Sequence, residues 1–172
     1  MDQRDAIRLK LWNNGVTADD FAGTGEKYRT AILEQYKICV EMADRVSARR
    51  GVTNTFFLTL NTGVLAAAGA FFNQAKSLPG WSLLPLVFAL VGQCVAWYWI
   101  VRSYRLLNSG KYAVIAVLEE RLPAFAYSRG EWEALGQGQD WRRYIPLSHM
   151  EQWIPVLFSI IFLVEYIFVI AL

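Results

Sequence analysis

The sequence predicts an all-α integral membrane protein with three transmembrane helices and a cytoplasmic helical bundle extending from them. Hydrophobic residues make up 55% of the 172 residues, more than the 45–50% or so that is typical of soluble domains. Residues 51–75 and 77–101 carry no Asp, Glu, Lys or Arg, and the apolar run 152–172 contains one, Glu165. Each run has the roughly 20 residues that a helix needs to cross a bilayer.

Residues 1–51 are predicted to form cytoplasmic N-terminal helices. They contain no apolar core or small-residue cleavage site of a removable signal peptide. Residues 26–50 lack Gly and Pro, and one helix face repeats at steps of three and four, which indicates a packing seam. An intramolecular bundle and an intermolecular coiled coil would both bury it. The seam consists of Ile32, Tyr36, Cys39, Ala43 and Val46. Only Gly51 separates this helix from the first span, so one rod from Glu26 to Phe72 is expected.

Residues 52–101 are predicted to form a transmembrane hairpin with spans at 52–72 and 81–101. The linker between them ends in Pro79-Gly80, a turn signal. Residues 102–151 are expected to form a cytoplasmic helix, which ends before Pro123, and a loop. Ser148 and Glu151 have the spacing of a capping box, which would start the third transmembrane helix at 152–172.

The distribution of basic residues predicts the orientation of the spans. All of the 17 Lys and Arg residues except Lys76 lie on one side of the predicted membrane segments. Cytoplasmic segments are enriched in Lys and Arg. The N-terminus is therefore expected inside and the C-terminus on the external or periplasmic side.

Three polar residues, Asn61, Gln93 and Glu165, are predicted to form a mid-membrane polar layer. At about 1.5 Å of rise per residue, each falls close to the bilayer centre. An ionisable group at this depth costs about 2.5–3.5 kcal/mol or more and rarely faces lipid. In one interpretation a protonated Glu165 hydrogen-bonds to Gln93 or Asn61 and joins helices. In a second it titrates in an ion or proton path, and in a third it contacts lipid where the bilayer thins.

Small and polar residues on the hairpin predict a helix-packing face. Small residues at such spacings let membrane helices approach closely. Three helices have too few partners to cover all of these residues, so the surplus is interpreted as a surface between subunits. The face consists of Thr55, Thr59, Thr62, Gly63, Ala66, Ala67 and Ala70 in the first span and Gly92 and Ala96 in the second.

Several functional classes find no support in the sequence. A net charge of +2 gives no polycationic surface for nucleic acid. The two cysteines lack the spacing of a metal or redox centre, and no catalytic motif or phosphate-binding loop is present. We therefore expect a protein that is not an enzyme and has no cofactor and no metal.

The stretch Glu34 to Gly69, with Arg49-Arg50 and Asn61-Thr62 as its most specific positions, resembles the RipA-type family of bacterial cytoplasmic-membrane proteins. The resemblance implies a homo-oligomeric, octameric assembly in the bacterial inner membrane without an assigned enzymatic chemistry. The helix-then-hairpin layout also resembles the two-span effector domains of bacterial nucleotide-signalling defence systems. That likeness is architectural only, and a shared architecture does not establish function.

Two functions remain open from the sequence. The first is a homo-oligomeric inner-membrane scaffold whose cytoplasmic region recruits a protein partner. The alternative is an oligomeric pore or effector of a defence or stress system. The expected partners are the lipid bilayer, other copies of the same chain and an unknown cytoplasmic protein.

Overall fold

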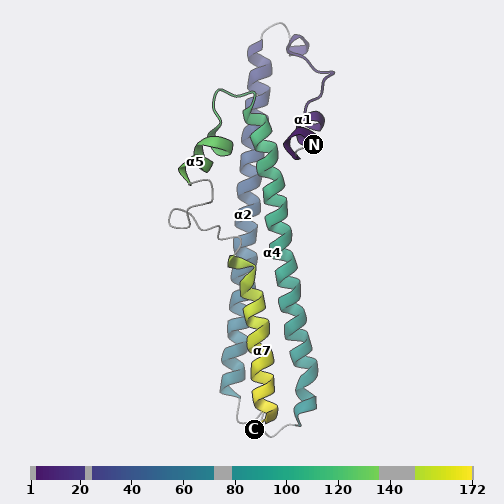
Figure 1. The fold of residues 1–172 in the computed structure, drawn as a ribbon, viewed down its shortest axis with the longest axis vertical. Coiled ribbons are helices and arrows are strands. Elements are labelled where there is room, and N and C mark those ends of the chain that lie inside the picture. The colour runs from purple at the N-terminus through teal and green to yellow at the C-terminus, as the bar shows by residue number, and fades with distance from the viewer. Residues whose placement is uncertain (1–2, 22–24, 72–78, 136–149, 172) are drawn as a thin grey trace. The chain divides into compact units, whose positions relative to one another are not determined.

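The computed structural model describes all residues except 1–2, 22–24, 72–78, 136–149 and 172. The described residues are helical with turns and contain no strand (Figure 1). They divide into two compact units, each of which is described by itself. Unit 1 comprises Met1–Ala48 and Leu106–Ile145, and unit 2 comprises Arg49–Arg105 and Pro146–Leu172.

Two long helices contribute residues to both units. Helix α2 (Gly25–Ala70) has 46 residues and agrees with the expected rod from Glu26 to Phe72. Helix α4 (Leu84–Glu119) has 36 residues and continues past the second predicted span without a break. After Glu119 three turn hydrogen bonds close the helix, the last from the Leu122 amide to the Glu119 carbonyl. Pro123 follows, and its ring disfavours further helix.

Unit 1 has an apolar core between α2 and α4. On α4, Ile115, Val117 and Leu118 are buried. On α2, Ile32, Ala43 and Val46 of the predicted seam are buried, while Tyr36 and Cys39 are half-buried. Short elements complete the unit: α1 (Gln3–Leu11), the 3-10 turn η1 (Ala18–Phe21), the π-helical turn η3 (Ala126–Glu131) and α5 (Trp132–Ala134).

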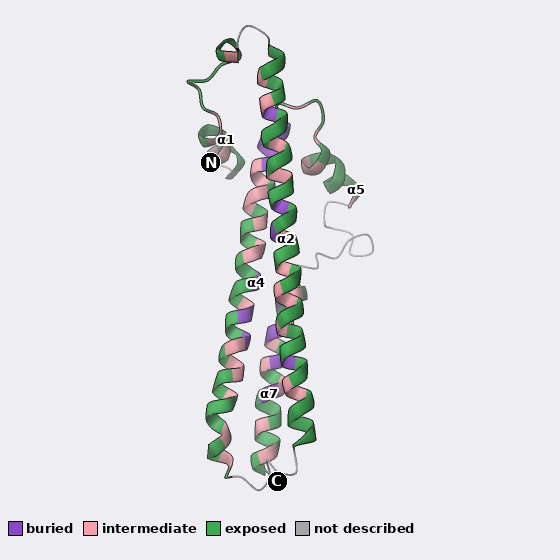
Figure 2. Cartoon of the chain, turned by 180° about the vertical axis from the view of Figure 1, so that it is seen from behind, coloured by how far each residue is buried: buried purple, intermediate pink, exposed green. Residues whose placement is uncertain are grey.

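Unit 2 is a three-helix bundle of α2, α4 and α7 (Trp153–Ala171). Its buried core is formed by Cys94, Trp97 and Val101 from α4 and by Phe158 and Phe162 from α7. Phe57, Val64 and Leu65 of α2 pack against this core. Outside these contacts most residues of the three helices are exposed in the single chain (Figure 2).

The 3-10 turn η2 (Gly80–Leu83) precedes α4 and packs closely against α7. A Cβ atom at Gly80 would come within 2.6 Å of Ile170 Cγ2, so this approach requires glycine. The Tyr166 hydroxyl donates to the Gly80 carbonyl at 3.3 Å. The predicted turn at Pro79-Gly80 is therefore anchored to the last helix.

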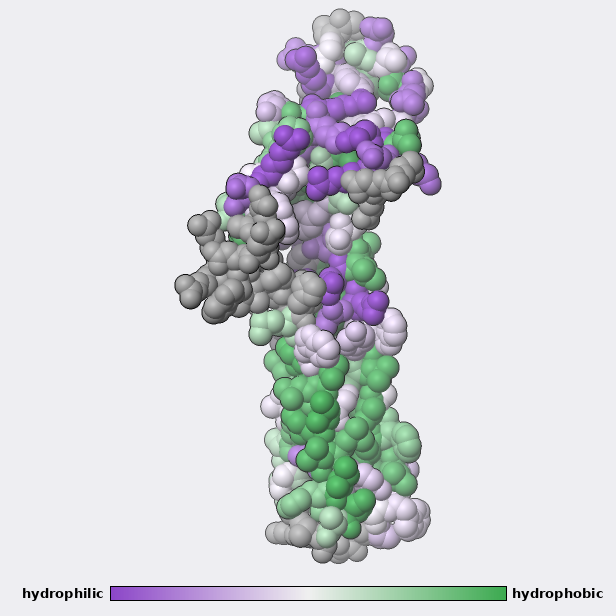
Figure 3. Space-filling view, in the orientation of Figure 1, coloured by the Kyte–Doolittle hydropathy of each residue, from purple (hydrophilic) through white to green (hydrophobic). Residues whose placement is uncertain are grey.

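Within the described residues, two helical stretches are long and apolar enough to cross a membrane: Gly80–Glu119 and Trp153–Ala171. The predicted third crossing, at 52–72 on α2, is not confirmed. Its hydropathy is lowered by Thr, Gly and two asparagines, Asn54 and Asn61. Large apolar side chains cover much of the visible surface of unit 2 (Figure 3).

Candidate functional site

The C-terminal end of α4 carries three consecutive charged residues, Glu119, Glu120 and Arg121, which we call the α4 hub. Glu119 is completely buried. Its carboxylate accepts hydrogen bonds from the Tyr127 amide at 2.8 Å, the Ser128 amide at 3.0 Å and the Ser128 hydroxyl at 2.5 Å. The Tyr36 hydroxyl of α2 donates a fourth at 3.3 Å. One carboxylate thus fastens η3 to both long helices of unit 1.

The protonation states of this cluster follow from the same contacts. Burial of Glu119 acts to raise its pKa, but the hydrogen bonds from Ser128 and from the Tyr127 and Ser128 amides outweigh it, so the pKa lies below its ordinary value. Burial, followed by the charge of Glu119, raises the pKa of Tyr36 to about 12. At neutral pH the cluster therefore contains a carboxylate and a neutral phenol that donates to it.

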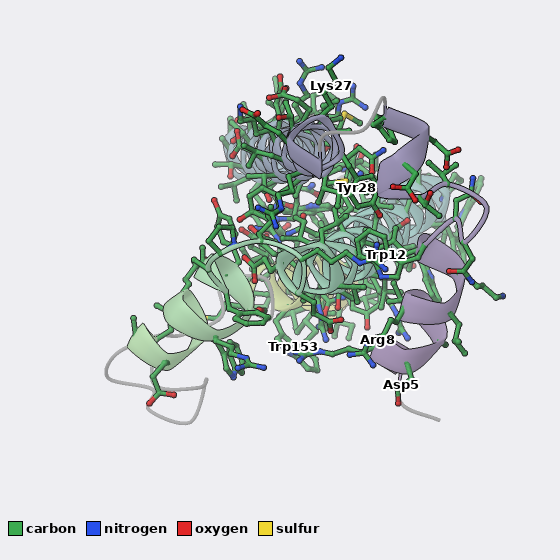
Figure 4. The ribbon with its side chains drawn as sticks, turned by 90° about the horizontal axis from the view of Figure 1, so that it is seen from above. Asp5, Arg8, Trp12, Lys27, Tyr28 and Trp153 are labelled. Carbon is green, nitrogen blue, oxygen red and sulfur yellow. The ribbon has the colours of Figure 1, made fainter. Side chains whose placement is uncertain are left out.

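The other two hub residues hold the N-terminal segment. Arg8 of α1 binds Glu120 through two hydrogen bonds of 2.9 and 2.6 Å and also pairs with Asp5 at 2.8 Å. Asp5 and Arg8 lie on α1 (Figure 4). The hydrogen bond from Arg8 lowers the pKa of Glu120. Since these groups are exposed, water screens the pair and its contribution to stability is small.

Arg121 makes the third connection of the hub. Its guanidinium donates to the Tyr28 hydroxyl at 2.7 Å and lies 3.5 Å from the centre of the Trp12 ring, a cation–π contact. Tyr28 also meets Phe21 edge to face, with ring centres 5.6 Å apart. Arg121 thereby contacts Trp12 directly, and it is linked to Phe21 of η1 through Tyr28.

Sequence reasoning did not identify the α4 hub. Charged residues at the end of a helix are usually solvated, and the α2 residues that bond to Glu119 and Arg121, namely Tyr36 and Tyr28, lie more than 80 residues earlier in the chain. The only local pattern in the sequence was two consecutive glutamates and an arginine shortly before Pro123, which ends the helix. It gives no indication of burial.

The centre of unit 2 is organised by Trp97. This residue is fully buried, and its indole Nε1 donates to Asn54 Oδ1 at 3.0 Å. Its ring stacks on Phe57 at 5.4 Å and contacts Phe158 at 6.1 Å. One tryptophan of α4 therefore joins α2 and α7, and it satisfies one of the asparagines that lower the hydropathy of α2.

The three residues of the predicted mid-membrane layer do not form the expected contacts. Asn61 is fully buried, but it donates to the Phe57 carbonyl of its own helix at 2.7 Å and accepts from Cys94 Sγ at 3.6 Å. Gln93 Nε2 is buried without a hydrogen-bond partner in the described structure. Glu165 is exposed and forms no hydrogen bond to any described residue.

The predicted pairing of Glu165 with Gln93 or Asn61 is therefore wrong for the single chain. The physical reason is that Glu165 lies on an exposed flank of α7, whereas Asn61 is fully buried and bonds to the Phe57 carbonyl and the Cys94 thiol. The cysteine was the residue that sequence reasoning overlooked here, since a lone apolar-segment cysteine carries no motif.

The predicted helix-packing face lies on the outside of unit 2. Its nine residues, Thr55, Thr59, Thr62, Gly63, Ala66, Ala67, Ala70, Gly92 and Ala96, are all exposed in the single chain. A Cβ atom added at Gly63 or Gly92 would meet no other atom within 4 Å. The face of α2 that is buried or half-buried carries different residues, among them Phe57 and Asn61.

Two polar contacts lie where α7 begins. Arg50 of α2 pairs with Glu151 at 3.2 Å, and Arg105 of α4 donates to Gln152 at 2.5 Å. Glu151 was predicted to close a capping box with Ser148. Ser148 lies outside the described residues, so the capping box stays a prediction; the carboxylate of Glu151 pairs with Arg50. The four residues connect all three helices of unit 2 at one level.

Among the described residues no group of three or more His, Cys, Asp or Glu side chains could hold a metal ion. The contacts of the described residues thus join the helices through buried hydrogen bonds and ring stacking, and they leave the small-residue face of unit 2 exposed.

A comparison with known families matches residues 33–171 to the profile of the octameric membrane protein family. The match includes most of α2 and all of α4 and α7. No curated protein and no solved structure matches the chain.

Proposed function

The chain belongs to the octameric membrane protein family, and on this basis we propose that it is a homo-octameric scaffold of the bacterial inner membrane. In this proposal unit 2 lies in the bilayer and unit 1 lies in the cytoplasm, where it recruits a protein partner. The chain works by organising other molecules and has no catalytic chemistry.

The packing of α2 in unit 2 supports a third membrane crossing in addition to the two apolar stretches. Residues 51–70 of α2 carry no charge and lie in the same bundle as α4 and α7. Asn54 and Asn61, which lower the hydropathy, have hydrogen-bond partners inside that bundle. Their amides are thus withdrawn from lipid, so the segment is compatible with a membrane position.

The exposed small-residue face of α2 is the observation that supports self-assembly. Thr55, Thr59, Thr62 and Ala66 are exposed in the single chain. In a membrane, helices associate through close contacts of small residues and through hydrogen bonds. A helix of a neighbouring copy can pack more closely on this face than lipid tails can, and it would therefore form more favourable contacts.

Glu165 favours a second candidate function, an oligomeric pore. It is an ionisable residue within α7 with no hydrogen-bond partner among the residues that the structure describes. Ionisable residues in a span often line ion or proton paths. A ring of such carboxyl groups could line a conducting pathway in the assembly.

Ion flux through reconstituted liposomes separates the scaffold from the pore. Purified oligomer is incorporated at known density, and the release of a trapped ion is followed for the wild type, Glu165→Gln and Ala66→Leu. The scaffold predicts sealed liposomes for all three proteins. Flux that requires the intact oligomer and changes with Glu165→Gln would contradict the scaffold and support the pore.

A further inference from the structure

Two sets of polar groups in unit 2 form no hydrogen bond to any residue that the structure describes. The hydroxyl of Thr53 donates to the Arg49 carbonyl of its own helix at 2.9 Å. By contrast, the exposed hydroxyls of Thr55, Thr59 and Thr62 form no hydrogen bond to a described residue. On α7, the exposed carboxyl group of Glu165 likewise forms no hydrogen bond to a described residue. Groups of this kind are costly in hydrocarbon unless they bond to their own helix, as Thr53 does, or pair with another protein surface.

The two sets lie on exposed surfaces of two different helices of the bundle. Successive residues are about 100° apart around a helix, so Thr55, Thr59 and Thr62 lie on roughly the opposite side of α2 from Phe57, which packs on the core. They therefore face away from α4 and α7 of their own chain. Glu165 follows Phe162 by one turn on the flank of α7, beyond the last buried residue of that helix.

The groups also match in depth. Thr62 lies eight residues before the end of α2 at Ala70, and Glu165 lies six residues before the end of α7 at Ala171. At about 1.5 Å per residue these separations are about 12 and 9 Å. If both helix ends lie at the same membrane surface, the side chain of a glutamate can bridge this difference.

We propose that the exposed threonine face of α2 binds the Glu165 flank of α7 in a second copy of this chain, with Thr62 and Glu165 hydrogen-bonded across the contact. The proposal rests on the octameric assembly proposed above and names its interface. Each copy would use one surface to bind the next copy and a different surface to bind the previous one. Such a head-to-tail contact generates a closed ring when the rotation between copies is right.

Disulfide cross-linking tests the contact directly. Cys39 and Cys94 are replaced by serine, since serine at 94 can still donate to Asn61, and Thr62→Cys and Glu165→Cys are introduced together. Oxidation in membranes should give a ladder of covalent species that extends to the octamer, because every copy links to two neighbours. Each single-cysteine variant should stay uncrosslinked.

Matched controls use residues at similar depth on other faces. Leu60 is exposed on a different side of α2, and Leu163 is exposed on a different side of α7. Leu60→Cys with Glu165→Cys, and Thr62→Cys with Leu163→Cys, should give no ladder. A ladder from the controls but not from the proposed pair would overturn the assignment, as would dimers formed by Thr62→Cys alone.

A second measurement does not depend on introduced cysteines. Thr62→Val keeps the shape and removes the hydroxyl, and Thr53→Val serves as its control because Thr53 bonds to its own helix. Thr62→Val should raise octamer dissociation several-fold in the wild type and leave it unchanged in a Glu165→Leu background. An equal effect in both backgrounds would refute the pairing.

The mass of the wild-type particle separates the two possible failures. If the particle is not an octamer, the proposed assembly fails. If it is an octamer but the proposed pair gives no ladder and Thr62→Val acts equally in both backgrounds, only this interface fails.

Discussion

Buried polar residues fix the positions of the elements in each unit. Glu119 is the clearest case, because a fully buried carboxylate collects four hydrogen bonds from η3 and α2. Hydrogen bonds to a charged group contribute about 1.5–3 kcal/mol each, and an unpaired buried charge is strongly destabilising. The residue therefore couples the order of residues 126–131 to the pairing of the long helices.

Glu119→Gln should release η3 while leaving α2 and α4 helical. An amide has one acceptor oxygen and no charge, so it cannot replace the bonds to both backbone amides and the Ser128 hydroxyl. We expect hydrogen exchange at the Tyr127 and Ser128 amides to quicken about tenfold or more. Glu131→Gln, at an exposed site of the same turn, is the control and should leave exchange unchanged.

The pH dependence of this contact follows from the sign of the shift. Because the pKa of Glu119 is lower in the folded state, its contribution is fully present above the ordinary glutamate pKa of about 4.3 and is lost as the pH falls through the folded value. Protection of the Tyr127 amide, corrected for intrinsic exchange, should be constant from about pH 8 to pH 5. A loss of protection between pH 7 and 6 would contradict this assignment.

Substitutions of Glu165 distinguish its possible roles. If the residue forms a hydrogen bond between copies, Glu165→Gln should be tolerated, while Glu165→Leu should weaken assembly by about 1–2 kcal/mol per contact. Oligomer stability measured by native electrophoresis across a detergent series should fall in the order wild type, Gln, Leu. Gln as damaging as Leu would show that the carboxylate is needed and would favour an ion path. If Glu165→Leu leaves oligomer stability unchanged, Glu165 has neither the hydrogen-bonding role nor the ion-path role.

At the scale of the helices, most of the architecture could be predicted from the sequence. The absence of Gly and Pro from residues 26–50 predicted the continuous α2, and the spacing of Ile32, Ala43 and Val46 predicted the face that is buried in unit 1. These features are local and periodic. The contacts of Glu119 with Tyr36 and of Asn61 with Cys94 could not be predicted, because the fold brings these side chains together from distant parts of the chain.

The outward face of α2 gives a prediction at the same scale. Ala66→Leu should disrupt assembly, because a larger side chain keeps a neighbouring helix away, whereas Leu60→Ala should have little effect. Both residues are exposed in the single chain, so the fold of the protomer should be unchanged in both variants. Native electrophoresis reports the particle size. The opposite pattern would mean that the assembly uses another side of α2.

At the scale of the whole molecule, the proposed orientation rests on the distribution of basic residues. A cysteine introduced at Ser77, with Cys39 replaced by serine, should react with an impermeant thiol reagent added to intact spheroplasts, since the segment between the first two spans is expected outside. Cys39 restored alone should react only after lysis. Labelling of the introduced cysteine only after lysis would reverse the orientation.

The central claim is that copies of this chain form an octamer within a membrane. Native mass spectrometry of the wild-type protein, released from nanodiscs, measures the number of copies directly. A chain mass of 19.6 kDa predicts a particle of about 157 kDa with a lipid-dependent shell, in line with the family to which the chain belongs. A dominant species at the mass of one chain, under conditions that preserve a known membrane oligomer, would contradict the account.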